Sequence, residues 1–206
     1  MKTEISDMLG FLQENFDSLS ANLVPLWHPL GFVSCVINDV SSSHIARVHY
    51  WPKGERRVKN PDWPIHTHTY RLQSLVMKGV VRDLQYHVQS GSEWCEYSVN
   101  YYSGGSVIVR TPNEVNAIVA VDELRRSGNY YEVPRGVYHQ SFVPYEQSAV
   151  TLVLLTDHNS ETPKVLGSKL EERYPYDRIS FDRKLFWEAI KEALENQSTN
   201  VGKGCS

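Results

Sequence analysis

A succession of short strand-like segments most constrains what this chain can fold into. Each segment is rich in Val, Ile and aromatic residues, and Gly, Pro or Asn turn signals separate it from the next. Alternating β and α units do not fit this pattern, which favours a sandwich or a barrel. The expected strand segments cover 32–40, 45–50, 65–86 with a turn at Lys78 and Gly79, 94–102, 107–110, 115–121, 130–133 and 150–155.

Amphipathic helices are predicted on both sides of this strand region. Residues 4–20 place Ile5, Leu9 and Leu12 on one helical face, and residues 181–195 do the same with Phe186 and Ile190. The Ser, Asn and Gly rich tail 197–206 is expected to be disordered. With 206 residues, we expect a single domain over 1–206 in which strands 32–155 form the barrel.

Composition and charge argue against several classes of protein. A formal net charge of −3 and a pI near 6.2 make a nucleic-acid-binding surface unexpected. Cys35, Cys95 and Cys205 show no CxxC spacing, so neither a disulfide framework nor a thiolate zinc site is expected. No signal peptide is recognisable, and the longest apolar run, 149–155, is too short to cross a membrane. We therefore expect a cytoplasmic protein with no membrane partner.

Two histidines stand two residues apart at His66 and His68. In an extended chain, alternate side chains point to the same face, so these imidazoles would lie about 6–7 Å apart along the backbone. That arrangement suits two ligands of one metal ion. Taken alone, an H-x-H pair is also compatible with chance, because the chain holds eight histidines.

A third histidine follows a tight turn further along the chain. Pro134 fixes φ and Gly136 allows a positive φ, so the chain turns before His139 at the start of the next strand. An imidazole at a strand start is placed to meet the first two. The sequence therefore predicts a three-histidine metal site.

These two segments together resemble the motifs of the cupin superfamily of small β-barrel metalloproteins. The first family motif, G-x5-H-x-H-x3,4-E-x6-G, is matched at His66, His68 and Gly79. The second, G-x5-P-x-G-x2-H-x3-N, is matched at Gly128, Pro134, Gly136 and His139. The resemblance covers 45–155 and implies an all-β fold: a single cupin barrel, jelly-roll-like with two sheets, flanked by N- and C-terminal helices.

Three positions depart from the family pattern. Asn60 stands at the opening Gly, Leu72 at the usual Glu ligand and Val143 at the closing Asn. The spacer 80–127 is long, so we expect an extra hairpin around 85–102. A barrel that has lost its metal remains an alternative reading, although such a barrel would be expected to lose histidines as well as the Glu.

The resemblance implies a metal centre with three imidazole ligands and no carboxylate. Imidazole binds several transition metals, so Fe(II) is the leading expectation while Zn, Mn, Ni and Co stay open. Three ligands leave about three positions of an octahedral ion for a chelating substrate and dioxygen. The set is similar to that of cysteine-dioxygenase-like (thiol dioxygenase) cupins, which implies an oxygen-dependent dioxygenase. Two features differ from those enzymes: no Tyr lies in 152–156, and no Cys adjoins His68.

Residues near the expected site follow from alternation and position. Tyr70 shares the parity of the two histidines and is the catalytic candidate, as a donor of a proton or hydrogen bond. The substrate-binding candidates are Trp63, Arg71, Gln73 and His49. Two of these candidates also have a structural reading: Tyr70 as a core aromatic residue and Arg71, of opposite parity, as a solvated or paired cation.

The remaining polar residues carry weaker signals. His28, His44, His87 and His158 have no partner at ligand spacing and are expected to be surface or structural residues. The basic loop containing Arg56, Arg57 and Lys59 could lie at the cavity rim and attract a carboxylate, or simply be solvated.

Two other functions stay open. A metal-dependent lyase or isomerase would polarise a carbonyl with the ion and move the proton with a Tyr. A non-catalytic cupin would bind a small ligand only. The expected partners are a small-molecule substrate and O2, and the extra helices suggest a homodimer.

Overall fold

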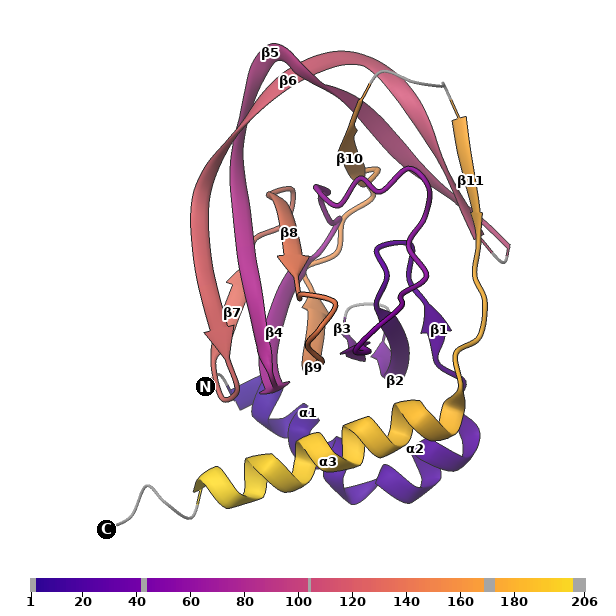
Figure 1. The fold of residues 1–206 in the computed structure, drawn as a ribbon, viewed down its shortest axis with the longest axis vertical. Coiled ribbons are helices and arrows are strands. Elements are labelled where there is room, and N and C mark those ends of the chain that lie inside the picture. Colours follow the sequence, from indigo (N-terminus) through magenta and orange to yellow (C-terminus); the bar gives the residue numbers. More distant parts are fainter. Residues whose placement is uncertain (1–2, 42–43, 104, 169–172, 202–206) are drawn as a thin grey trace.

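The computed structural model describes residues 3–41, 44–103, 105–168 and 173–201 as two antiparallel sheets with helices at one end (Figure 1). The helices are α1 (Thr3–Glu14), α2 (Phe16–Asn22) and α3 (Arg183–Val201). The strands are β1 (Leu26–Trp27), β2 (Val33–Ser41), β3 (His44–Trp51), β4 (Arg71–Lys78), β5 (Val80–Tyr102), β6 (Gly105–Arg126), β7 (Tyr130–Val133), β8 (Tyr138–Phe142), β9 (Ala149–Thr156), β10 (Lys164–Gly167) and β11 (Arg173–Asp177).

The strand order joins segments that are distant in sequence. One sheet has the order β1-β2-β3-β9-β4-β7 and the other β10-β5-β6-β11, with β8 paired to β5. Strand β9 lies between β3 and β4, so the chain returns from its last third to the middle of the first sheet. The expected all-β class, with a two-sheet body and flanking helices, is confirmed.

Alternation on the central strands separates two apolar layers. Leu152 and Leu154 of β9 belong to the layer that the helices cover, while Val153 and Leu155 belong to the barrel interior. All eight residues of β9 are buried, because this strand has packed layers on both of its faces. Six of its eight residues are apolar, and the other two, Thr151 and Thr156, are buried as well.

The helices close the outer face of the first sheet. Ile5 and Leu12 of α1 and Phe186 and Ile190 of α3 are fully buried against strands β2, β3, β4 and β9. Among the residues that the structure describes, no helix is both long enough and apolar enough to cross a membrane.

Both predicted helices differ from expectation, the first by an interruption and the second at its ends. The expected helix 4–20 is broken at Asn15, whose Nδ2 donates to the Phe11 carbonyl (2.9 Å), so α1 and α2 are separate. Helix α3 starts after Asp182, whose Oδ1 accepts from the Leu185 amide (2.9 Å) as an N-cap.

The prediction of disorder from residue 197 is wrong as far as Val201. Helix α3 continues past residue 195, and Gln197 Nε2 donates to the Met77 carbonyl (2.7 Å) and the Ser127 hydroxyl (3.1 Å). Propensity alone did not reveal this tertiary anchor. Residues 202–206 lie outside the described part of the chain.

Strands β5 and β6 form one long hairpin that arches over the barrel (Figure 1). The sequence predicted shorter, separate strands here, because Gly91 and Pro112 look like strand ends. The structure instead shows register shifts between Ser90 and Trp94 and between Cys95 and Tyr97, where the ladder continues past a bulge. The spacer 80–127 is therefore an integral part of the second sheet.

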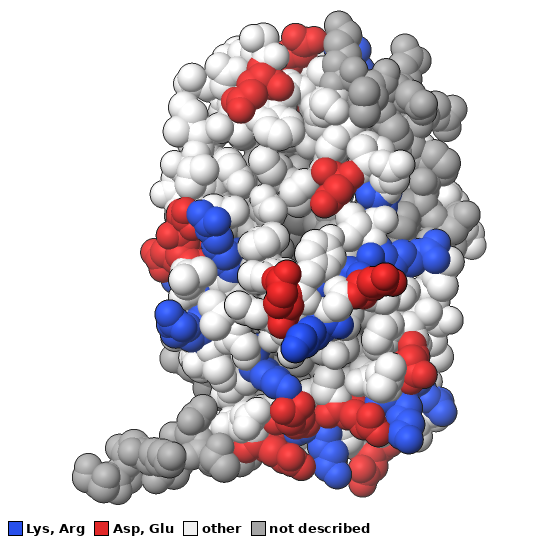
Figure 2. Space-filling model, viewed as in Figure 1, with Lys and Arg blue, Asp and Glu red and all other residues white. Residues whose placement is uncertain are grey.

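Surface charge is mixed on the face seen in Figure 2. Lysines, arginines and acidic residues intermingle there, mostly toward the helical end. On the described part of this face, no broad area carries charge of one sign.

Candidate metal centre and its cavity

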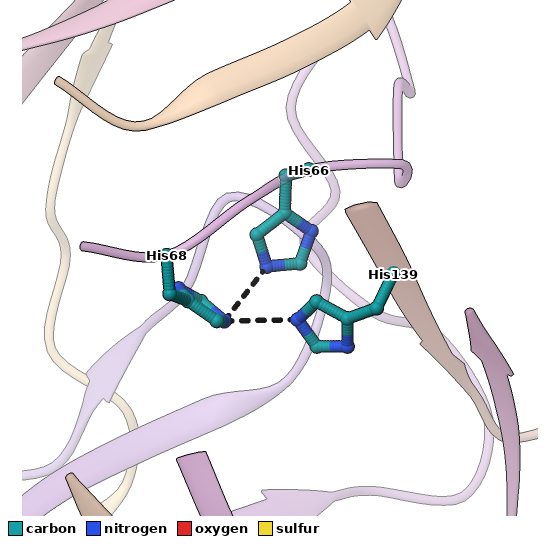
Figure 3. A group of neighbouring side chains, drawn as sticks. All are labelled: His66, His68 and His139. Atoms are coloured by element: carbon teal, nitrogen blue, oxygen red, sulfur yellow. Dashed lines mark hydrogen bonds between the residues drawn. The ribbon is translucent and has the colours of Figure 1, made fainter. Parts of the chain in front are cut away.

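The three predicted histidines come together from two neighbouring segments (Figure 3). His139 lies on β8, whereas His66 and His68 lie in the extended segment before β4, not on a strand as expected. The backbones of His66 and His139 pair directly: each amide donates to the other's carbonyl, at 3.0 and 2.8 Å. This reciprocal pair fixes the two segments that carry the imidazoles.

The ring nitrogens have spacings suited to one metal ion. His68 Nε2 lies 3.2 Å from His66 Nε2 and 2.9 Å from His139 Nε2. Two nitrogens bound ~2.1 Å from one ion at a right angle lie ~3 Å apart. Among the residues that the structure describes, these histidines form the only group of three or more metal-ligand side chains. The residues present therefore fit a transition-metal ion.

The protonation state of the rings also suits metal binding. His66 Nδ1 donates to the Pro64 carbonyl (2.8 Å), which leaves the lone pair on Nε2, facing the other rings. Burial lowers the pKa of His66, His68 and His139, and the neighbouring imidazoles lower the pKa of the latter two further. All three are neutral near pH 7, the form that binds metal.

Position 72 supplies no ligand. Leu72 is 7% exposed and packs in the apolar interior with Val76 and Val133. Val143, at another of the three departures from the motif, is 1% exposed in the same layer. Three neutral imidazoles therefore leave the full charge of a bound cation uncompensated by ligands.

Two spaces that share part of their lining adjoin the histidines. The outer cavity has a volume of about 360 Å³ and an apolar wall that includes Trp63, Ile108 and Val165. The inner one, about 40 Å³, lies within the barrel among residues of β3, β4 and β9. His66, His68 and Tyr70 line both spaces, so the candidate metal centre stands at their junction.

Three of the predicted neighbours line these cavities. The Tyr70 ring stacks on the His68 ring, with centroids 4.6 Å apart and planes 15° apart. Burial raises the pKa of Tyr70 to about 12, so it carries its proton at neutral pH. Trp63 lines the outer cavity and packs against Tyr97. His49 lines the inner one, where burial and then Arg47 lower its pKa to about 3.

Arg71 and Gln73 are not brought to these cavities. Arg71 is paired with Glu132 of β7, and Gln73 accepts from the Tyr130 hydroxyl (3.0 Å), both on the opposite side of the strand. They border a separate surface pocket instead. The physical reason is parity: positions 71 and 73 alternate with 68, 70 and 72, which face the barrel interior.

The basic loop divides between two roles. Arg56 donates to the carbonyls of Val143, Pro144 and Pro52 at 2.6, 2.9 and 2.8 Å, so it holds two loops together. Arg57 is exposed, whereas Lys59 lines the outer cavity.

Several cavity residues were not predicted from the sequence. His28 stacks on Phe32 (4.2 Å between centroids) and lines both spaces, and His158 lines the outer one with its ring 5.2 Å from Tyr70. Both were expected at the surface or in structural roles. Arg47 also lines both spaces. For Arg47, alternation with His49 on β3 was the one sequence signal that it shares a cavity with that residue. The loops that carry His28 and His158 have no such periodic signal.

A buried carboxylate connects the segments around the histidines. Glu96 on β5 accepts from Lys164 Nζ (2.6 Å), the Tyr138 hydroxyl (2.8 Å) and Asn113 Nδ2 (3.0 Å). Tyr138 directly precedes His139, and the Lys164 amide donates to the Thr67 hydroxyl (2.9 Å) between His66 and His68. Glu96 thus ties both ligand-bearing segments to the second sheet.

Comparisons with known proteins reach only distant structures. No family model and no curated protein matches the chain. An RmlC-like cupin from Shewanella frigidimarina is 14% identical with a TM-score of 0.38, covering 66% of this chain and 86% of its own. The polyketide cyclase RemF from Streptomyces resistomycificus is 13% identical with a TM-score of 0.44, covering 71% and 82%. The DMSP lyase DddQ from Ruegeria pomeroyi is 14% identical with a TM-score of 0.42, covering 75% and 66%.

Proposed function

We propose that this protein is a non-haem iron oxidoreductase, an oxygen-dependent dioxygenase that acts on a small metal-chelating substrate. The observation that carries the proposal is the convergence of three neutral imidazole Nε2 atoms at the junction of two cavities, with Leu72 in place of a carboxylate ligand. A dioxygenase places both atoms of O2 in its substrate, so the reaction balances without an external reductant.

The residues of the site would have different roles in this reaction. His66, His68 and His139 would hold Fe(II), which supplies a site where substrate and dioxygen meet and exchange electrons. Tyr70, which lines both cavities and keeps its proton at neutral pH, would donate a hydrogen bond to the bound substrate or dioxygen. Trp63 supplies an apolar wall that excludes water, and neutral His49 borders the inner space.

The absence of a carboxylate ligand supports this choice of chemistry. A ligand set without negative charge leaves the cation more Lewis-acidic and better able to bind an anionic, chelating substrate. The set resembles that of the thiol dioxygenases, so small thiols are the first substrates to test, followed by diketones and catechols. Zn, Mn, Ni and Co bind the same ligands, and metal analysis has to choose among them.

The experiment combines metal analysis with oxygen consumption. Protein purified without added metal is analysed for bound ions, stripped with a chelator and reloaded with Fe(II), and O2 uptake is then followed with the substrate panel. We expect uptake to vanish on stripping and return with Fe(II). His139→Ala should abolish it, whereas His87→Ala, an exposed position on β5, serves as the matched control. An iron-loaded protein inert to oxygen with every compound would refute the proposal.

A second candidate rests on Tyr70. A protonated phenol stacked on a ligand ring and facing the cavity also suits a metal-dependent lyase or isomerase, in which the ion polarises a carbonyl and the phenol donates a proton. Turnover of carbonyl substrates under strictly anaerobic conditions would favour this reaction. Tyr70→Phe should then abolish turnover while metal content stays unchanged.

A further inference from the structure

Arg47 occupies an unusual place for a charged side chain. It lies on β3, a strand in the middle of the first sheet, where it pairs with Val36 of β2 and Val153 of β9. Its neighbours Ala46 and Val48 belong to the layer beneath the helices. Arg47 therefore faces the barrel interior, and it lines both the inner and the outer cavity.

No group in the described part of the chain neutralises this arginine. Its Nε is buried without a hydrogen-bond partner, and no ion pair of Arg47 is found among the described residues. Among the described residues that line the two cavities there is no Asp and no Glu. The Arg47 side chain is half-buried, and removing part of a guanidinium from water without a counter-charge is costly unless an anion joins it.

Other cations reinforce the positive potential of the outer cavity. Arg178 and Lys59 also line the outer cavity. After burial, the charge of Arg47 acts to lower the pKa of His49, so its field reaches the inner cavity that His49 lines. Low-dielectric walls with charge of one sign concentrate ligands of the opposite sign.

We propose that Arg47, assisted by Arg178, forms an oxyanion subsite that binds the carboxylate of a small substrate whose apolar body packs against Trp63, Ile108 and Val165. This inference rests on the proposed function and gives it a substrate class. The planar fork of a guanidinium matches the two oxygens of a carboxylate. The volume of about 360 Å³ suits a small molecule, whose remaining polar group would reach the histidines.

The test measures binding and not turnover. Isothermal titration of the full chain, metal-free and loaded with redox-silent Zn²⁺, compares phenylacetate with phenylacetamide, which shares its body but lacks the charge. We expect phenylacetate to bind more tightly in both forms. Arg47→Met should weaken phenylacetate binding roughly tenfold to a hundredfold and leave phenylacetamide binding unchanged. Arg57→Met removes the same charge from the exposed loop and should change neither.

Further variants keep the test decisive if Arg47→Met does not fold. Arg47→Lys retains the charge without the fork and should give an intermediate loss, and Arg178→Met alters only an exposed side chain and should also weaken phenylacetate. Equal affinity for phenylacetate and phenylacetamide, or phenylacetate binding independent of both arginines, would overturn the subsite. Binding of phenylphosphonate without phenylacetate would overturn the choice of carboxylate.

The two proposals fail separately. Arginine-dependent binding of phenylacetate in a protein that never consumes oxygen would refute the oxygenase function and leave the subsite standing. Oxygen consumption combined with arginine-independent binding would refute the subsite alone.

Discussion

Replacing Glu96 by Gln should destabilise the protein by about 2–4 kcal/mol. Glu96 is 7% exposed and accepts from Lys164, Tyr138 and Asn113. A hydrogen bond to a charged group contributes about 1 kcal/mol more than one to a neutral group, which gives about 2 kcal/mol for Tyr138 and Asn113. The Lys164 side chain is 35% exposed, so solvent limits its ion pair to about 1 kcal/mol more.

Urea denaturation at pH 7, followed by fluorescence, measures this change. Glu114→Gln is the control, because Glu114 pairs with Arg110 on the same strand at a solvent-exposed position and should contribute less than about 0.5 kcal/mol. Because Glu96 also ties the segments on both sides of the histidines, Glu96→Gln should weaken metal affinity about tenfold. An unfolding free energy within 0.5 kcal/mol of the wild type would refute this account of the buried carboxylate.

The loss of stability caused by Glu96→Gln should become smaller as the pH falls. Burial acts to raise the pKa of Glu96, but hydrogen bonds from Lys164, Tyr138 and Asn113 outweigh it and hold the pKa below the ordinary value of 4.5. Since the folded-state pKa is depressed, the stabilisation is present above pH 4.5 and is lost as pH falls through the folded-state value. The difference between wild type and Glu96→Gln should therefore shrink in acid, whereas a constant difference down to pH 3 would contradict the direction of the shift.

Three further outcomes are expected. His139→Ala should remove the rise in melting temperature on adding metal, which for the wild type corresponds to about 2.7 kcal/mol at a hundredfold excess over Kd; an equal rise in the variant would exclude His139 as a ligand. Phe186→Ala should cost about 3–5 kcal/mol in urea denaturation, because the ring is fully buried between α3 and the first sheet, and a cost below 1 kcal/mol would contradict that packing. Gly79→Ala should destabilise by more than 1 kcal/mol, since φ is +80° and a Cβ would lie 2.3 Å from the Ser148 carbonyl oxygen; unchanged thermal stability would show that the turn relaxes.

Local chemistry made the centre of the site predictable. Alternation placed His66, His68 and Tyr70 on one face, and the Pro134 to Gly136 turn placed His139 at a strand start. Both signals depend on a few consecutive residues. The same alternation excludes Arg71 and Gln73 from that face, so their assignment to the substrate-binding site did not follow the rule that succeeded beside them.

The outer cavity residues and the ends of several elements could not be predicted, because they depend on contacts between segments that are distant in the sequence. His28 and His158 reach the cavity from loops whose paths are set by tertiary packing. The bulges of β5 and β6 keep the long hairpin continuous through residues that resemble strand ends. Gln197 and Met77, which form a hydrogen bond, are far apart in the sequence. None of these features has a periodic signature.

The reciprocal backbone pair of His66 and His139 has a consequence for the order of assembly. Main-chain hydrogen bonds within the barrel align the two segments that carry the imidazoles, and these bonds do not depend on a metal ligand bond. We therefore expect metallation to follow folding: the apoprotein is a folded receptor, and ions exchange at its cavity without unfolding the chain. The metal bound in the cell would then depend on which ions are available, and at what concentrations, when the folded protein binds metal.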